Sequence, residues 1–285
     1  MKKVTTIILL FLFSLGACSP TRLFFYPNRV LYLDPHDVDI QFNVHKVKSL
    51  NGREIVALEF QTKMEPKGVV VHFHGNFGNV SNHFTQAYFL VNYGYDVLTF
   101  DYQGFGASDG KPSPLNIIED GIAIVRFAEG KKRNPKGGVV VFGQSIGGAA
   151  ALVTAVKEPL VKGAIIESTF TRYRSMARYA MSKSLLLWIF YPFYPFLLPR
   201  KYDPIHHIPN LSPRPLLLVH GENDRVIPVK MSKKLFRKAN EPKELMIVKK
   251  AGHLGCRRAN NKTYDDKFVD FIDSALGIKS NDESK

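Results

Sequence analysis

The chain has 285 residues, of which 45% are hydrophobic and 12% aromatic, so it can bury a sizeable core as one large globular domain. Its 39 Lys and Arg against 25 Asp and Glu give a net charge of +14, which favours anionic surroundings such as a phospholipid surface, nucleic acid or an acidic substrate. Only two cysteines occur, Cys18 and Cys256, which excludes a disulfide-stapled scaffold.

Residues 1–17 have the pattern of an export signal. A basic start, Met1-Lys2-Lys3, precedes an uncharged stretch of fourteen residues rich in Ile, Leu and Phe. That stretch is shorter than the ~20 residues that a membrane-spanning helix needs. Leu15-Gly16-Ala17-Cys18 resembles the lipobox of bacterial lipoproteins. The resemblance implies cleavage before Cys18, a diacylglycerol thioether on its sulfur, and a fatty acyl group such as palmitate on its amino group.

The sequence therefore predicts an exported protein whose Cys18 anchors it by lipid to a bacterial membrane, with a tether over residues 18–37. Ser19 after the cysteine resembles the signal for the outer membrane, where the source has two membranes. The alternative is a secretory signal in which Cys18 lies near the cut by chance.

From residue 38 onward, apolar runs bounded by Gly and Pro predict eight strands, and stretches with helical spacing lie between the later ones. The expected strands are Val38–Val47, Ile55–Gln61, Val69–Phe73, Asp96–Phe100, Val139–Phe142, Gly163–Ile166, Leu216–Val219 and Leu245–Val248. The expected helices lie near Ser81–Asn92, Pro114–Glu129, Ile146–Val156, Lys230–Ala239 and Thr263–Leu276. This order predicts an α/β domain over residues 38–276, with a mostly parallel sheet covered by helices on both faces.

Residues 169–213 interrupt this alternation and are expected to form a small cap above the sheet. The run Leu185–Leu198 contains six aromatic residues, and its two prolines, Pro192 and Pro195, argue against a membrane span. The cap has two interpretations, a lid that lines an acyl pocket or a plain cover for the sheet. The tail, residues 277–285, is polar enough to be disordered.

A candidate nucleophile lies where an apolar strand meets a helix. Gly143-Gln144-Ser145-Ile146-Gly147 fits the Gly-x-Ser-x-Gly pattern, in which small residues permit a sharp turn that exposes the serine hydroxyl. Serine needs a base to remove its proton and an acid to orient that base. Asp224 and His253 each follow a later strand, and the order Ser145, Asp224, His253 is that of the α/β-hydrolases.

The chain resembles the α/β-hydrolase superfamily over roughly residues 38–276, and more narrowly the serine-hydrolase branch that includes alpha/beta hydrolase domain-containing protein 13. The matching segments are His74 to Asn79, Asp101 to Gly110, Pro112 to Pro114, Gly143 to Gly147, Glu167 to Phe170 and His220 to Pro228. The resemblance implies Ser145 as nucleophile, His253 as general base and then acid, and Asp224 as the residue that orients the imidazole.

The same resemblance implies an oxyanion hole made by the backbone N–H groups of Ile146 and Asn76, with Phe77 as the alternative second donor. The expected activity is hydrolysis of a carboxylic ester, acyl or lipid-like, through an acyl-enzyme on Ser145. A peptidase or thioesterase with the same triad is one alternative. A lipoprotein that keeps the fold as a scaffold without catalysis is the other.

The sequence favours no cofactor, metal or nucleic acid. His72-Phe73-His74 could suggest a metal, but His72 lies within an apolar strand and no further ligands follow nearby. The glycine-rich segments lack the patterns that bind nucleotides. Glu222 is a minor alternative to Asp224, and Asp101 is expected to brace the Gly-rich loop. Basic pairs such as Arg257-Arg258 fit an anionic membrane better than nucleic acid, and the sequence leaves the oligomeric state open.

Overall fold

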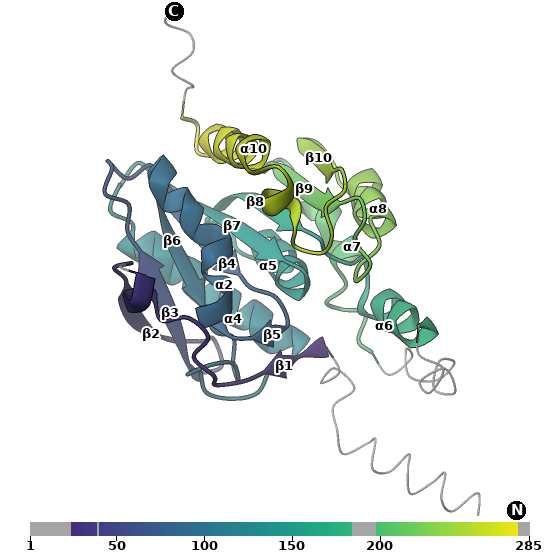
Figure 1. Ribbon diagram of the computed structural model, residues 1–285, viewed down its shortest axis with the longest axis horizontal. Helices are drawn as coiled ribbons and strands as arrows, with labels where there is room; N and C mark the ends of the chain where they lie inside the picture. Colours follow the sequence, from purple (N-terminus) through teal and green to yellow (C-terminus); the bar gives the residue numbers. More distant parts are fainter. Residues whose placement is uncertain (1–23, 39, 184–197, 279–285) are drawn as a thin grey trace, which may run out of the picture.

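An eight-stranded sheet forms the centre of the molecule. The computed structural model describes residues 24–38, 40–183 and 198–278, so the predicted signal, Cys18, nearly all of the aromatic run and the last seven residues lie outside the described part. The strands are β2 (Asn43–Lys48), β3 (Glu54–Phe60), β4 (Gly68–Phe73), β6 (Tyr95–Phe100), β7 (Val139–Gln144), β8 (Val161–Glu167), β9 (Leu216–Gly221) and β10 (Lys243–Val248). Their order is β10-β9-β8-β7-β4-β6-β3-β2, and all neighbours pair in parallel except that β3 is antiparallel to both β6 and β2 (Figure 1).

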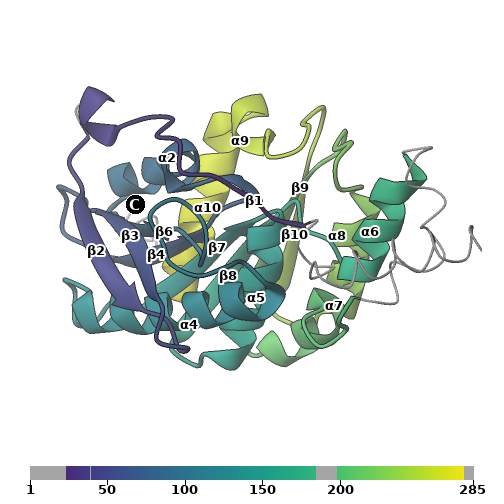
Figure 2. The ribbon, with the colours of Figure 1, turned by 90° about the horizontal axis from the view of Figure 1, so that it is seen from below.

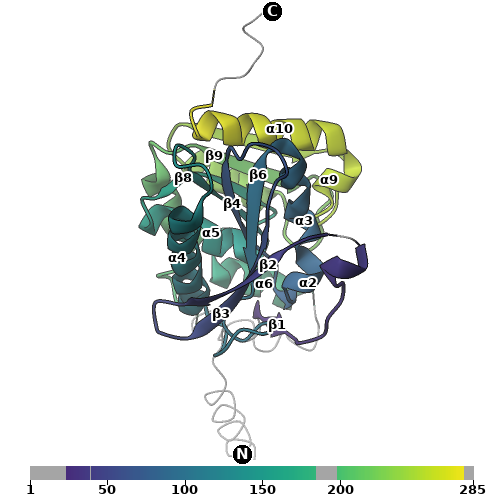
Figure 3. The ribbon, with the colours of Figure 1, turned by 90° about the vertical axis from the view of Figure 1, so that its left-hand side faces the viewer.

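Helices cover both faces of this sheet. They are α2 (Val80–His83), α3 (Thr85–Tyr88), α4 (Pro114–Lys131), α5 (Ile146–Lys157), α6 (Tyr173–Ser182), α7 (Pro204–His207), α8 (Lys230–Lys238), α9 (Cys256–Ala259) and α10 (Asn261–Ala275). α4 and α5 lie on one face, and α2, α3 and α10 lie on the other (Figures 2 and 3). The predicted α/β-hydrolase fold is confirmed.

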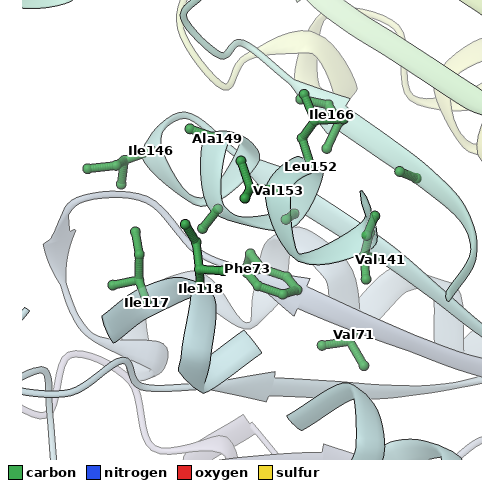
Figure 4. Packing of buried hydrophobic residues seen from close by; sticks show 14 of the residues in the cluster. Val71, Phe73, Ile117, Ile118, Val141, Ile146, Ala149, Leu152, Val153 and Ile166 are labelled. Atoms are coloured by element: carbon green, nitrogen blue, oxygen red, sulfur yellow. The ribbon is translucent and has the colours of Figure 1, made fainter. Parts of the chain in front are cut away.

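The layered arrangement follows from the sequence of the central strands. Every residue of β4, β6 and β7 is buried, as parallel strands covered on both faces require. Side chains that point to alternate faces build two apolar cores, one under α4 and α5 and one under α3 and α10. Figure 4 shows the first core, with Ile117, Ile118, Leu152 and Val153 gathered against Val71, Phe73 and Val141.

Two predicted elements differ from the structure. The first strand was expected from Val38, but residues Pro35–Val38 form a 3-10 turn and the strand begins at Asn43. The helix expected near Ser81–Asn92 is broken into α2, α3 and a 3-10 segment (Phe89–Tyr93), which ends at Gly94 with a positive φ of 89°. Tertiary packing decides both, because single turns become stable once their apolar side chains are buried.

Within the predicted tether, residues 24–32 form a strap across the carboxyl ends of the strands. Phe24 and Phe25 are buried, and β1 (Tyr26–Pro27) pairs in parallel with β5 (Phe77–Gly78). No pattern in the sequence predicts this strap, because Phe24-Phe25-Tyr26 lies close to the predicted export signal. The strap matters for the site, because β5 belongs to the loop that follows β4.

Candidate active site

Ser145 lies on a strained turn between β7 and α5. Its φ of 56° and ψ of −120° are unfavourable for a residue with a side chain, and such strain is typical of functional turns. The Ser145 N–H donates to the Glu167 carbonyl (2.9 Å), and the Ser145 carbonyl accepts from the Thr169 hydroxyl (2.7 Å). A Cβ on Gly147 would lie 2.2 Å from the His74 carbonyl oxygen, so only glycine lets α5 begin this close to β4.

The fold brings His253 and Asp224 to Ser145. Asp224 follows β9 and His253 follows β10, and these strands pair as neighbours. His253 Nε2 lies 3.2 Å from Ser145 Oγ, and His253 Nδ1 lies 2.7 Å from Asp224 Oδ2. Because a carboxylate only accepts, Nδ1 carries the proton, and the lone pair of Nε2 faces the serine hydroxyl. This tautomer can take the proton of Ser145.

The Asp224 carboxylate is held ionised by four donors. Burial by itself raises its pKa, but hydrogen bonds from His220, His253 and the Ile227 amide outweigh burial and hold that pKa well below its usual value. Oδ1 accepts from the amides of Val226 and Ile227, both at 2.8 Å. A buried, ionised Asp224 can therefore stabilise positive charge on His253 during proton transfer.

His220 is a buried neighbour of the triad to which the sequence analysis gave no role. Its Nε2 lies 2.8 Å from the Ile227 carbonyl and 3.3 Å from Asp224 Oδ2. Since a carbonyl only accepts, Nε2 carries the proton and Nδ1 accepts from the Ser232 hydroxyl (2.7 Å). The available signal was its position at the end of β9, four residues before the acid.

Asn76 and Ile146 line one cavity together with Ser145. Within the described ranges, no protein oxygen accepts from the backbone N–H of either residue. Ile146 is also the first residue of α5, where the helix dipole adds positive potential. Both amides can therefore hold a negatively charged oxygen. Phe77, the alternative donor, lies in β5 with an exposed side chain.

Hydrogen bonds to residues that follow β6 hold the loop that carries Asn76. The Tyr102 hydroxyl donates to the His74 carbonyl (2.8 Å), and Asp101 Oδ1 accepts from the Val80 amide (2.7 Å). Burial raises the pKa of Asp101 to about 7, although amides of Val80 and Ala107 oppose that shift. Burial also holds the pKa of His74 well below its usual value, so its imidazole is neutral. Of the two amides, that of Ala107 belongs to the Gly-rich loop that Asp101 was expected to brace, and that of Val80 follows the Asn76 loop.

The cavity at Ser145 has a volume of about 240 Å³ and a mainly apolar lining. It is enclosed by the strap, the Ser145 turn, the segment after Asp224 and α6, through the residues Phe24, Tyr26, Asn76, Ser145, Ile146, Phe170, Met176, Ala177, Ala180, Met181, Val226 and Ile227. None of these described lining residues carries a charged side chain. The α6 part of the predicted cap therefore lines the cavity, while the aromatic run at residues 185–197 lies outside the described residues.

The remaining polar residues near the motifs make contacts that stabilise the fold. Glu167 accepts from Gln144 and from the Tyr264 hydroxyl, and His72 lies between Thr99 and Gln144. Glu222 accepts from the Lys250 amide. Cys256 is a buried free thiol whose pKa burial raises far above its usual value. None of these contacts places a second reactive group at Ser145.

The described residues contain neither a metal-binding cluster nor a membrane-spanning helix. No cluster of three or more His, Cys, Asp or Glu side chains in this part of the chain could hold a metal ion. No described helix is both long enough and apolar enough to cross a membrane.

Sequence comparison places this fold and site in a family. The family described as "Serine aminopeptidase, S33" matches residues 64–211, more than half of the chain, and "TAP-like protein" matches residues 197–278. The chain belongs to the α/β-hydrolase superfamily. One relative of this hydrolase is "Uncharacterized protein YfhR" of Escherichia coli, 31% identical over 260 residues that cover 90% of the chain and 88% of the relative.

Another relative carries a functional name. "Lysophosphatidylserine lipase ABHD12" of Xenopus tropicalis is 32% identical over 239 residues, which cover 76% of the hydrolase and 60% of the relative. Among solved structures, the Pyrococcus furiosus esterase Pf2001 superposes with a TM-score of 0.71 over 87% of the hydrolase and 96% of the esterase. At 18% identity, that likeness shows the fold.

Proposed function

We propose that this α/β hydrolase cleaves carboxylic esters of apolar acyl chains through an acyl-enzyme on Ser145. The observation that carries the proposal is the continuous chain from Ser145 Oγ through His253 to Asp224, with 3.2 Å and 2.7 Å between the atoms, beside a cavity whose described lining residues carry no charge. The esterase and lipase names among its relatives support the same class of reaction.

The proposed reaction uses the groups already described. His253 Nε2 takes the proton of Ser145 as Oγ attacks the ester carbonyl. The amides of Asn76 and Ile146 bind the oxyanion, each being worth roughly 10²–10³ in rate. The His253 imidazolium then protonates the departing alkoxide, and a water molecule activated by the same imidazole releases the acid. Asp224 keeps the imidazole in the required tautomer throughout.

The cavity favours an ester over a peptide with a free amino terminus. An aminopeptidase has to hold a charged α-amino group, for which a carboxylate is the natural partner. Among the described residues that line the cavity, none carries a carboxylate. An apolar acyl chain needs no such partner, because it gains free energy by leaving water.

We also propose that Cys18 carries the lipid anchor and that the exported chain remains at a bacterial membrane. The lipobox-like residues before Cys18 support this, together with 37 basic against 25 acidic residues after removal of the signal, which contains only Lys2 and Lys3 as charged residues. Cys18→Ser is expected to release the protein from membranes. Retention of a fully processed Cys18→Ser protein would contradict the anchor.

Labelling with a fluorophosphonate tests the catalytic proposal. The wild-type protein should be labelled and Ser145→Ala should not, while Ser182→Ala, at an exposed serine that ends α6, should label like wild type. A series of nitrophenyl esters should show a preference for medium or long acyl chains over acetate. An unlabelled wild-type protein would contradict a serine hydrolase, and faster cleavage of an aminoacyl nitroanilide would favour the peptidase alternative.

A further inference from the structure

Exposed apolar side chains gather beside the mouth of the cavity. Of eleven large hydrophobic side chains that are exposed in the described residues, five belong to the strap or to β5, and a sixth lies on the cavity wall. These six residues, which we call the apolar rim, are Tyr26, Val30, Leu31, Tyr32, Phe77 and Val226. Soluble proteins rarely gather such side chains on one surface unless that surface binds a partner.

Four of the six rim residues adjoin one another or the cavity, and Val30 and Leu31 directly precede one of these four, Tyr32, in the strap. Tyr26 and Phe77 face each other in the β1–β5 pair, and the ring centroids of Tyr32 and Phe77 are 6.1 Å apart. Tyr26 and Val226 both line the cavity that contains Ser145. The rim therefore borders the site itself, and a partner bound there lies at its opening.

Hydrogen bonds fix the backbone of the rim. Asn79 Nδ2 donates to the Val30 carbonyl (2.7 Å), the Tyr32 amide donates to Ser81 Oγ (3.0 Å), and the Gly106 amide donates to the Asn28 carbonyl (3.0 Å). The exposed fractions of Val30 and Leu31 are 56% and 65%. Their side chains are thus held in water by an ordered backbone.

The start of the strap limits how far the cavity can lie from the predicted anchor. Phe24, which is buried and lines the cavity, lies only six positions after Cys18 in the chain. Six residues span at most about 20 Å when fully extended. The length of chain before Phe24 therefore keeps the cavity opening close to the membrane surface.

The charge beside the rim suits an anionic surface. Residues 169–213 contain six Lys and Arg, among them Arg174 and Arg178 of α6, and a single acidic residue, Asp203, which is fully buried. β1 and α6 lie at the same end of the molecule, opposite α10 (Figures 1 and 3). The strap supplies apolar surface there, and the cap supplies positive charge that anionic lipid headgroups attract.

We propose that the apolar rim and α6 rest in the headgroup boundary of the membrane that holds Cys18, so that the acyl ester substrate passes from the bilayer into the cavity without crossing water. This inference rests on the proposed ester hydrolysis and lipid anchor, and it names the substrate as a membrane lipid. The apolar rim would remove from water the side chains that the fold leaves exposed.

The membrane inference is tested by comparing a variant of the apolar rim with a control variant on β2. The lipidated full chain is reconstituted in vesicles of phosphatidylethanolamine and phosphatidylglycerol and given either a long-chain umbelliferyl ester within the vesicles or nitrophenyl butyrate in solution. The rim variant is Val30→Gln with Leu31→Gln, and the matched control is Val44→Gln, whose side chain on β2 is 58% exposed. The rim variant should lose about tenfold or more on the vesicle ester, through lost apolar insertion, and keep its rate on the soluble ester. The control should keep both rates.

Lipid contact is measured separately, by a photo-crosslinking residue placed at Leu31 or at Val44. Crosslinks to lipid at Leu31 and none at Val44 are expected, and this readout needs no catalysis. Equal vesicle activity of rim and control variants, or equal crosslinking at both positions, would overturn the membrane inference. A wild-type protein that crosslinks at Leu31 but cleaves neither ester would leave the docking in place and refute the proposed hydrolysis.

Discussion

Replacing Asp224 by Asn tests the proposed mechanism most directly, because it changes one atom of the triad. Asp224 Oδ1 accepts from the Val226 and Ile227 amides at 2.8 Å, so the Asn oxygen should take that place. The NH₂ group then faces His253 Nδ1, where the carboxylate now accepts at 2.7 Å. A donor at that position requires an unprotonated Nδ1, which puts the proton on Nε2 and prevents it from accepting the hydroxyl of Ser145.

The expected loss in kcat is about 10⁴-fold, the effect of holding a triad histidine in the wrong tautomer, which corresponds to about 5.5 kcal/mol in the barrier. The assay is hydrolysis of a nitrophenyl ester by wild type, Asp224→Asn and the matched control Glu222→Gln. Glu222 lies two residues away and is exposed, so the control should retain its rate. A loss of less than tenfold in Asp224→Asn would refute the assigned tautomer and the role of Asp224.

Asp224→Asn should also change how the stability of the fold depends on pH. The pKa of Asp224 is lower in the folded than in the unfolded chain, so its ionisation stabilises the fold above the ordinary carboxyl range and this contribution is lost as the pH falls through and below that range. Asp224→Asn should therefore be less stable than wild type at neutral pH, and the difference should shrink in acid. Urea unfolding at several pH values measures it. A difference that is the same at every pH would contradict the lowered pKa.

Three further changes probe the surroundings of the triad. Gly147→Ala should abolish activity and destabilise the fold, because its Cβ would lie 2.2 Å from the His74 carbonyl; near-normal activity and melting temperature would contradict that crowding. Phe24→Ala should lower the free energy of unfolding in urea by about 3 kcal/mol, since the Phe24 ring packs edge-on against Tyr173 with 5.2 Å between ring centroids. It should also weaken the preference for long acyl chains, because Phe24 lines the cavity. An unchanged chain-length profile would contradict a role of the strap in the cavity wall. Burial raises the pKa of Asp101 to about 7, so between about pH 4 and pH 7 this carboxyl ionises more readily in the unfolded chain and the wild-type fold loses stability as the pH rises. The stability of Asp101→Asn relative to wild type should therefore increase over that range. A parallel pH dependence of the two proteins would refute this.

Much of the fold could be predicted from local patterns. The continuous Val-rich runs of β4 and β7 indicate strands buried on both faces, and Gly143 to Gly147 marks the sharp turn at Ser145. Because parallel strands end at the same edge of a sheet, the loops after β4, β7, β9 and β10 had to meet there. That rule placed Ser145, Asp224 and His253 at one edge of the sheet, while the resemblance to the α/β-hydrolases added Asn76.

The strap, by contrast, has no local signature. Phe24 and Tyr26 fall within the tether expected after the predicted anchor, and only the β1–β5 pairing and the burial of Phe24 show that they enclose the cavity. The role of His220 also has no local signature. Its Nε2 lies 3.3 Å from Asp224 Oδ2 only because the loop after β9 folds back on the strand. Contacts of this kind join segments whose sequences carry no information about each other.

The sequence by itself determined a mostly parallel sheet and the nucleophile turn, because periodicity and glycine placement act through the backbone within a few residues, and its resemblance to the α/β-hydrolases indicated the triad. Tertiary structure alone decided what surrounds Ser145: a cavity wall built from the strap and α6, the Asn76 and Ile146 amides that no acceptor among the described residues occupies, and an exposed apolar rim at the opening. The physical reason is that burial and exposure are properties of packed surfaces, so the side chains that enclose a substrate are chosen only when distant segments meet.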